Sequence, residues 1–117
     1  MRYMFLLKMP EDVGEAPEAL QAAMGAEMSA LFASGTMIDA GGLGPRRESA
    51  QIELRGGDVM VTNGPWAEAK EVAGGYAVLE VGSHEEAIQA GRRLLEIHQE
   101  HWPGWEGSVE VRPLHPA

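Results

Sequence analysis

Two stretches with helical spacing alternate with short stretches typical of β-strands, and this order restricts the folds open to the chain. The first helical stretch begins at Pro17, and apolar residues recur along it at intervals of three and four. The second follows Ser83 and Glu86, which form the Ser-x-x-Glu pattern of a helix N-terminus. The predicted order is strand, helix, strand, hairpin, strand, helix and strand.

The predicted strands are short, and glycine or proline separates most of them. They cover residues 2–8, 36–40, 51–55, 58–62, 76–81 and 108–112. Gly56 and Gly57 separate the third and fourth strands at the spacing of a hairpin turn. The strands are too few and too closely connected for a doubly wound sheet. The pattern predicts an α+β fold: a ferredoxin-like sandwich with a mainly antiparallel sheet, two helices on one face and an inserted hairpin.

A chain of 117 residues is long enough to form one domain whose core needs neither disulfides nor metals. We expect a single domain over residues 1–117, in which residues 113–117 form a C-terminal tail. Because both helices cover the same face of the sheet, the other face needs a cover of its own. Met4, Leu6, Met37 and the aromatic residues are expected to make that face apolar. The sequence therefore predicts a homodimer joined through the sheets.

The charge of the chain excludes several kinds of partner. Acidic residues outnumber basic ones by 18 to 9, which gives a net charge of −9. This charge repels phosphate backbones and anionic membranes, so we expect neither a nucleic-acid nor a membrane partner. Cysteine is absent, which excludes disulfides and thiolate nucleophiles. The apolar run at residues 3–7 is too short for a signal peptide or a membrane span, so we expect a cytoplasmic protein.

Polar and aromatic side chains gather between the hairpin and the strand that follows it, within residues 58–81. This setting, between two strands and next to glycine and proline, is typical of a ligand-facing loop. The predicted ligand-binding residues are Asn63, Trp66, Lys70, Tyr76 and Gly42.

Lys70 is the best candidate for a functional side chain in this loop. It lies between Glu68 and Glu71, and it could bind an anionic ligand or have its pKa adjusted by these carboxylates. A solvated lysine is the alternative. Asp39 and Tyr76 are further catalytic candidates, although a tyrosine at the start of a strand more often packs with its hydroxyl satisfied.

Other polar pairs have simpler interpretations. Arg46 and Arg47 could clamp a carboxylate, but a solvated pair is the default. His98 and His101 are three residues apart and could share a metal, yet His98 continues the apolar side of its helix and is expected to be packed or capping. The Gly-x-Gly-x-x-Gly context of a dinucleotide site is missing. We therefore expect no metal site and no cofactor.

The stretch from residue 61 to residue 81, VTNGPWAEAKEVAGGYAVLEV, resembles the signature of the YCII-related proteins of the DGPF-domain type. The Asp-Gly-Pro-Phe tetrapeptide of that signature is replaced by Asn63-Gly64-Pro65-Trp66, and the Ala-Glu-x-Lys-Glu and Gly-Gly-Tyr elements follow. The similarity extends to RYMFLLK near the start, AGGL at residues 40–43 and SVEVRP at residues 108–113. It covers essentially the whole chain.

The resemblance implies a ferredoxin-like dimeric α/β barrel in a family whose activity is largely undefined. Members are often encoded beside extracytoplasmic-function sigma factors, which implies a regulatory role. It also implies a histidine–aspartate pair in a cleft, but here Met24 lies about where the histidine would fall and Asp39 remains as the carboxylate. Asn63 keeps the turn geometry of the aspartate without its charge, and Trp66 adds an indole N–H donor.

Three functions fit these features. The first is a small soluble homodimer of accessory or regulatory role that binds a small molecule in a cleft framed by residues 63–76. The second is an enzyme that acts on a small metabolite through Lys70, Asp39 and Tyr76. The third is a protein-interaction module linked to sigma-factor regulation.

Overall fold

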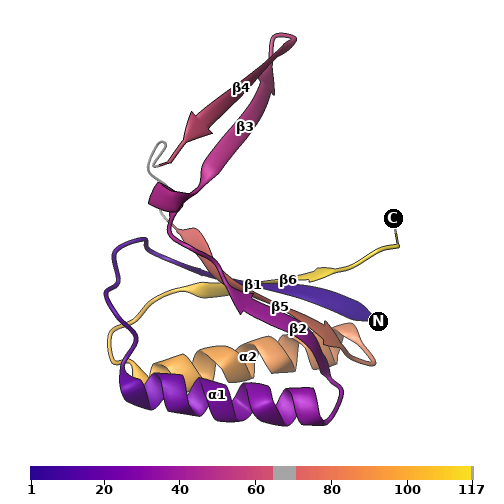
Figure 1. Ribbon diagram of the computed structural model, residues 1–117. Coiled ribbons are helices and arrows are strands. Elements are labelled where there is room, and N and C mark those ends of the chain that lie inside the picture. Colours follow the sequence, from indigo (N-terminus) through magenta and orange to yellow (C-terminus); the bar gives the residue numbers. More distant parts are fainter. Residues whose placement is uncertain (65–70, 117) are drawn as a thin grey trace.

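The computed structural model describes residues 1–64 and 71–116, and its elements follow the predicted order (Figure 1). These elements are β1 (Arg2–Met9), α1 (Glu18–Ala33), β2 (Met37–Gly42), the 3-10 helix η1 (Arg46–Glu48), β3 (Ala50–Arg55), β4 (Asp58–Asn63), β5 (Val72–Glu80), α2 (His84–His101) and β6 (Ser108–Pro113).

The main sheet has the strand order β2-β5-β1-β6, and each neighbouring pair is antiparallel. Both helices lie on the same face of this sheet (Figure 1). β3 and β4 form a separate two-stranded sheet that is inserted between β2 and β5. The predicted ferredoxin-like α+β sandwich with an inserted hairpin is confirmed.

The ends of the helices coincide with the local signals in the sequence. Ser83 Oγ accepts a hydrogen bond of 3.2 Å from the backbone N–H of Glu86, and the Glu86 carboxylate accepts one of 2.8 Å from Gly82 N–H. After α1, Gly35 adopts a φ of 79°, which favours glycine and ends the helix. Neither α1 nor α2 is both long and apolar enough to cross a membrane.

The core lies between the helices and the two inner strands of the main sheet. Alternate residues of β1 and β5 point toward the helices, among them Phe5 and Leu79, which are fully buried. α2 meets them with Ala87 and Leu94. The intervening residues of the same strands project from the opposite face, which we call the open face.

The open face carries Met4 and Leu6 as predicted, but its other apolar residues differ from the prediction. Val78 and Tyr76 of β5 pair with these two residues and therefore share their face. The aromatic residues of β1, which include Tyr3, face the helices and are buried there.

Met37 also faces the helices, contrary to the prediction. It pairs with Leu79 and is only 3% exposed. The next pair in the ladder joins Asp39 to Val78, so Ile38 is an extra residue in β2. Such a bulge changes which residues of a strand face the core, and the sequence alternation did not reveal it.

β5 begins at Val72, which is earlier than the predicted start at Tyr76. The additional residues continue the pairing with the end of β1, and Gly74 forms a bulge because it has no partner in the ladder. A Cβ atom on Gly74 would lie 2.7 Å from the Met9 methyl group. Glycine therefore suits this bulge for steric reasons.

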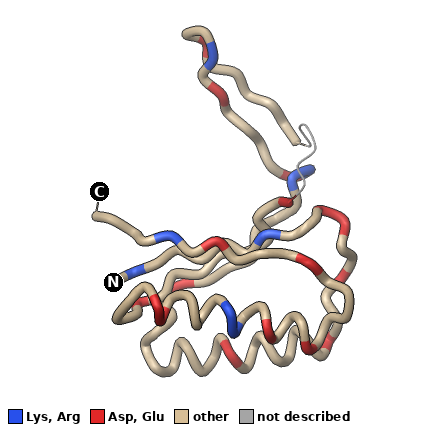
Figure 2. The backbone as a smooth tube through the Cα atoms, turned by 180° about the vertical axis from the view of Figure 1, so that it is seen from behind, with Lys and Arg blue, Asp and Glu red and all other residues tan. Residues whose placement is uncertain are grey.

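The β3–β4 hairpin projects from the body of the domain on the side away from the helices (Figures 1 and 2). Gly56 and Gly57 form its turn with φ values of 59° and 85°, which favour glycine. The radius of gyration is 16.0 Å, compared with about 13 Å for a compact domain of similar length. The projecting hairpin accounts for the difference.

The base of the hairpin is fixed to the loop between β1 and α1. The Arg46 guanidinium donates hydrogen bonds of 2.7 and 2.9 Å to the two carboxylate oxygens of Glu11. The side chain of Arg46 is only 12% exposed. Directly after β4, Gly64 N–H donates a hydrogen bond of 2.7 Å to Ser49 O, which directly precedes β3. Arg46 thus clamps a carboxylate of its own chain, whereas the sequence analysis favoured a solvated arginine pair.

Substitution of Gly64 tests how tightly the base is packed. A Cβ atom at Gly64 would lie 1.7 Å from the backbone oxygen of Arg46. We therefore expect Gly64→Ala to lower the free energy of unfolding by about 1–3 kcal/mol in urea denaturation. Gly25→Ala is the matched control: its Cβ atom meets nothing within 4 Å, and it should raise the free energy by about 0.5–1 kcal/mol. Equal stability of wild type and Gly64→Ala would contradict this packing.

The Arg46–Glu11 pair predicts a pH dependence of stability. The hydrogen bond from Arg46 holds the pKa of the Glu11 carboxyl below its ordinary value. A lowered folded-state pKa stabilises the fold above the unfolded-state pKa, and this contribution is lost as the pH falls through the folded-state value. The loss of stability caused by Glu11→Gln should therefore be present at neutral pH and vanish in acid. In an Arg46→Gln background the same substitution should have little effect at either pH, and urea denaturation measures all four variants.

Candidate functional site

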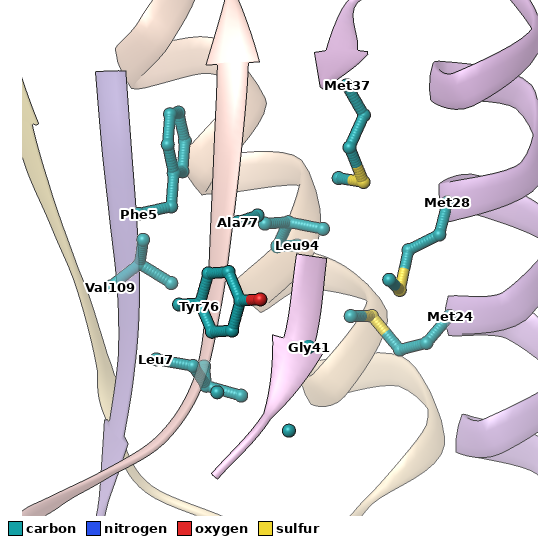
Figure 3. Close-up of a pocket in the computed structure, with 12 residues that line it drawn as sticks. Phe5, Leu7, Met24, Met28, Met37, Gly41, Tyr76, Ala77, Leu94 and Val109 are labelled. Atoms are coloured by element: carbon teal, nitrogen blue, oxygen red, sulfur yellow. The ribbon is translucent and has the colours of Figure 1, made fainter. Parts of the chain in front are cut away.

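A cavity of about 240 Å³ lies between α1 and the main sheet (Figure 3). Apolar side chains from both helices and four strands line it. They include Phe5, Leu7, Met24, Met28, Leu94 and Val109. The wall therefore consists almost entirely of hydrocarbon and thioether groups.

The cavity exists because two strands lack side chains where they face α1. Ala40 pairs with the buried Ala77, so the next pair on the same face joins Gly42 to Gly75. Both of these glycines line the cavity. A Cβ atom at Gly42 would meet no atom within 4 Å. The paired glycines leave a hollow that no neighbouring side chain fills.

Tyr76 also lines the cavity, but its ring covers the open face of the sheet. It pairs with Gly41, and a Cβ atom on that glycine would lie 2.8 Å from the tyrosine ring. The phenolic hydroxyl donates a hydrogen bond of 3.3 Å to Asp39 Oδ2. Two of the three predicted catalytic candidates are therefore in contact at the edge of the sheet.

Met24 lies in the wall of the cavity, at the position where the resemblance would place a histidine (Figure 3). Asp39 pairs with Val78 and shares the open face with it, and its carboxylate accepts hydrogen bonds from Ala40 N–H and Tyr76. The sheet therefore separates residue 24 from the Asp39 carboxylate. A histidine–aspartate pair would not form between these two positions.

The remaining predicted ligand-binding residues have different placements. Asn63 ends β4, where it pairs with Ala50 at the base of the hairpin. Trp66 and Lys70 lie outside the described residues. Gly42 and Tyr76 are thus the two predicted residues that line the cavity.

The sequence analysis missed most of the apolar wall. Met24, Met28 and Leu94 belong to the two stretches with helical spacing, and that spacing indicates burial but not a cavity. The sequence does contain one usable signal: methionines in the first helical stretch together with glycines in two strands. Where flexible methionine side chains face glycines, which have no side chain, a hollow can remain between them.

The two histidines near the end of α2 each contact neighbouring residues of the protein. His98 is buried, with Nδ1 2.8 Å from Leu94 O and its ring centroid 4.5 Å from that of Trp105. His101 Nε2 lies 3.5 Å from a carboxylate oxygen of Glu100. Within residues 1–64 and 71–116, no group of three or more His, Asp or Glu side chains is arranged to hold a metal ion.

Replacement of Met24 by histidine tests the apolar character of the cavity. Burial should lower the imidazole pKa below its ordinary value of about 6.5. The unfolded chain then binds more protons, so the free energy of unfolding relative to wild type should fall as the pH decreases. NMR titration and urea denaturation measure both effects, with Ala22→His on the exposed side of α1 as control. An imidazole pKa raised above that of the control would contradict the separation from Asp39.

Comparison with known proteins is consistent with this architecture. The sequence matches the family described as YCII-related domain over residues 1–114. An uncharacterized protein of Rhizobium meliloti (strain 1021) is 32% identical over 83 residues, which cover 66% of this chain and 63% of the relative. The chain thus matches less than two thirds of the length of that relative. Because the family match spans nearly the whole chain, the protein belongs to the YCII-related family.

Proposed function

We propose that the protein binds a small molecule in the cavity between α1 and the main sheet, and that the buried part of this molecule is uncharged and apolar. The observation that supports this most strongly is the glycine pair Gly42–Gly75, which leaves an apolar hollow in an otherwise packed domain. Close packing is the rule in protein interiors, and a concave apolar pocket is the usual form of a small-molecule site.

The size and lining of the cavity restrict its ligand. The volume is about 240 Å³, whereas a dry apolar cavity of about 150 Å³ can already hold benzene. A ligand slightly larger than a substituted benzene ring therefore fits. A charged group buried among Met24, Met28 and Leu94 would lose its hydration without gaining a partner, so the buried part of the ligand is uncharged.

Residues of the predicted 63–76 loop are proposed to contribute ligand contacts at the mouth of the cavity. The loop leads into β5, whose Gly75 and Tyr76 line the cavity. Trp66 and Lys70 are the loop side chains proposed to contact a ligand there. An anionic tail that extends toward solvent from an apolar ligand would suit Lys70.

The active form is proposed to be a homodimer joined through the open face. That face carries half-buried apolar side chains: Met4, Leu6, Tyr76 and Val78. Its charges are balanced, because Lys8 and Arg112 are offset by Glu110 and Asp39, and Arg2 pairs with Glu80. An accessory or regulatory role in the cytoplasm, as in proteins of the DGPF-domain type, is the proposed setting of ligand binding.

A panel of small apolar compounds, measured by thermal shift and native mass spectrometry, tests the proposed site. A ligand should raise the melting temperature with increasing concentration. Gly42→Val should remove this response, because its methyl groups occupy the open space opposite Gly75, while the fold and its stability are retained. Thr62→Val places a valine on the hairpin, with a methyl group in place of the threonine hydroxyl, and should leave binding intact. Binding that survives Gly42→Val would exclude this cavity, and failure of every compound would favour the protein-interaction alternative.

An enzyme is the second candidate, and the contact between Tyr76 and Asp39 favours it. A phenol hydrogen-bonded to a carboxylate can donate or accept a proton next to a bound molecule. Asp39 lies in the edge strand β2, and Tyr76 lines the cavity together with Gly41. Mass spectrometry of each bound compound after incubation distinguishes turnover from simple binding.

A further inference from the structure

The β3–β4 hairpin has one strongly apolar face. Ile52 pairs with Val61, and Leu54 pairs with Val59, so these four side chains lie on the same side of the two-stranded sheet. Their exposed fractions range from 64% to 71%. We call these four residues the arm face.

The arm face is costly to leave in water. An isolated two-stranded hairpin is marginally stable, and exposed strands in natural proteins are usually protected by charged side chains. Here the hairpin extends from the domain, and its fixed contacts lie at its base near Arg46 and Gly64 (Figures 1 and 2). Four neighbouring branched side chains therefore form an apolar patch with no covering layer in the described part of the chain.

We propose that the arm face docks on a second copy of this chain, so that each hairpin grips the other subunit. This inference rests on the proposed homodimer and assigns the hairpin to its interface. The hairpin rises from the same side of the main sheet as the open face (Figures 1 and 2). A second copy that sits on the open face would therefore meet the hairpin as well, and a two-fold axis makes both contacts reciprocal.

The area of the arm face argues for an occupant that also covers the sheet. Six-residue strands in a pair form a surface of about 20 by 10 Å, or about 200 Å². Stable interfaces bury about 800 Å² on each partner. The open face of the four-stranded sheet adds about 400 Å² of planar area, and the relief of side chains increases both values. The two surfaces together approach the size of a stable interface, whereas the hairpin alone does not.

Charge also favours this mode of contact. Each copy carries a net charge of −9, so two copies repel one another except where the contacting surfaces are neutral. The arm face contains no charged residue, and Arg55 lies opposite Asp58 beside the turn. On the open face, Lys8 and Arg112 are offset by Glu110 and Asp39. The two surfaces proposed to touch therefore carry little net charge.

Light scattering and analytical ultracentrifugation of matched lysine variants test the arm. Leu54→Lys places a charge on the arm face, whereas Met60→Lys places the same charge on the opposite face, beside Glu53. Both wild-type residues are exposed, so both variants should fold as judged by circular dichroism. We expect wild type and Met60→Lys to dimerise at micromolar concentration with dissociation constants within threefold of each other. Leu54→Lys should raise the constant at least tenfold.

The possible outcomes distinguish the proposed arm contact from the proposed dimer itself. A wild type that stays monomeric at high micromolar concentration removes both the proposed dimer and the arm contact, while cavity binding is measured independently. A dimer that Leu54→Lys leaves unchanged, or that both lysine variants weaken equally, overturns the arm contact but keeps the dimer.

A labelling experiment gives a second readout that does not depend on a charge. The chain has no cysteine, so Leu54→Cys and Met60→Cys each create a single site for a spin label. The label at position 54 should become immobilised as the protein concentration rises, and the label at position 60 should stay mobile. Equal mobility of both labels in the dimer would overturn the proposal.

Discussion

The antiparallel pairing of β1 with β5 is the constraint on which the other features depend. It places Phe5 and Leu79 against the helices and turns Met4 and Leu6 toward the open face. Because these two strands are the inner strands of the sheet, every other layer of the domain is built on their register. The bulge at Gly74 continues this pairing beyond the regular ladder and leads the chain into the sheet.

Glycine in neighbouring strands determines the chemistry of the candidate site. Where Gly42 and Gly75 pair, the sheet presents no side chains to α1, and Met24 and Met28 face the resulting hollow. Tyr76 lines this hollow, but its hydroxyl is hydrogen-bonded to Asp39 on the opposite face of the sheet. The cavity therefore suits an apolar molecule better than it suits proton transfer.

A few polar contacts at the base of the hairpin fix its position. The alternation of residues along its two strands gives it one apolar face. Glu11 holds Arg46, and Gly64 approaches the same turn so closely that a larger residue would not fit. This anchorage places the hairpin on the same side of the main sheet as the open face. The apolar side chains of the open face and of the hairpin are the observations behind the proposed self-association.

Local signals in the sequence determined the element order, the Gly56–Gly57 turn and the start of α2 at Ser83, because each depends on residues close together in the chain. The same reasoning identified Gly42 and Tyr76 but not the methionine wall of the cavity. Only the tertiary structure decided that Met37 faces the helices, that β5 starts early and that the sheet separates Asp39 from residue 24. These features follow from bulges and from the register of strands distant in sequence, and alternation within one strand does not specify either.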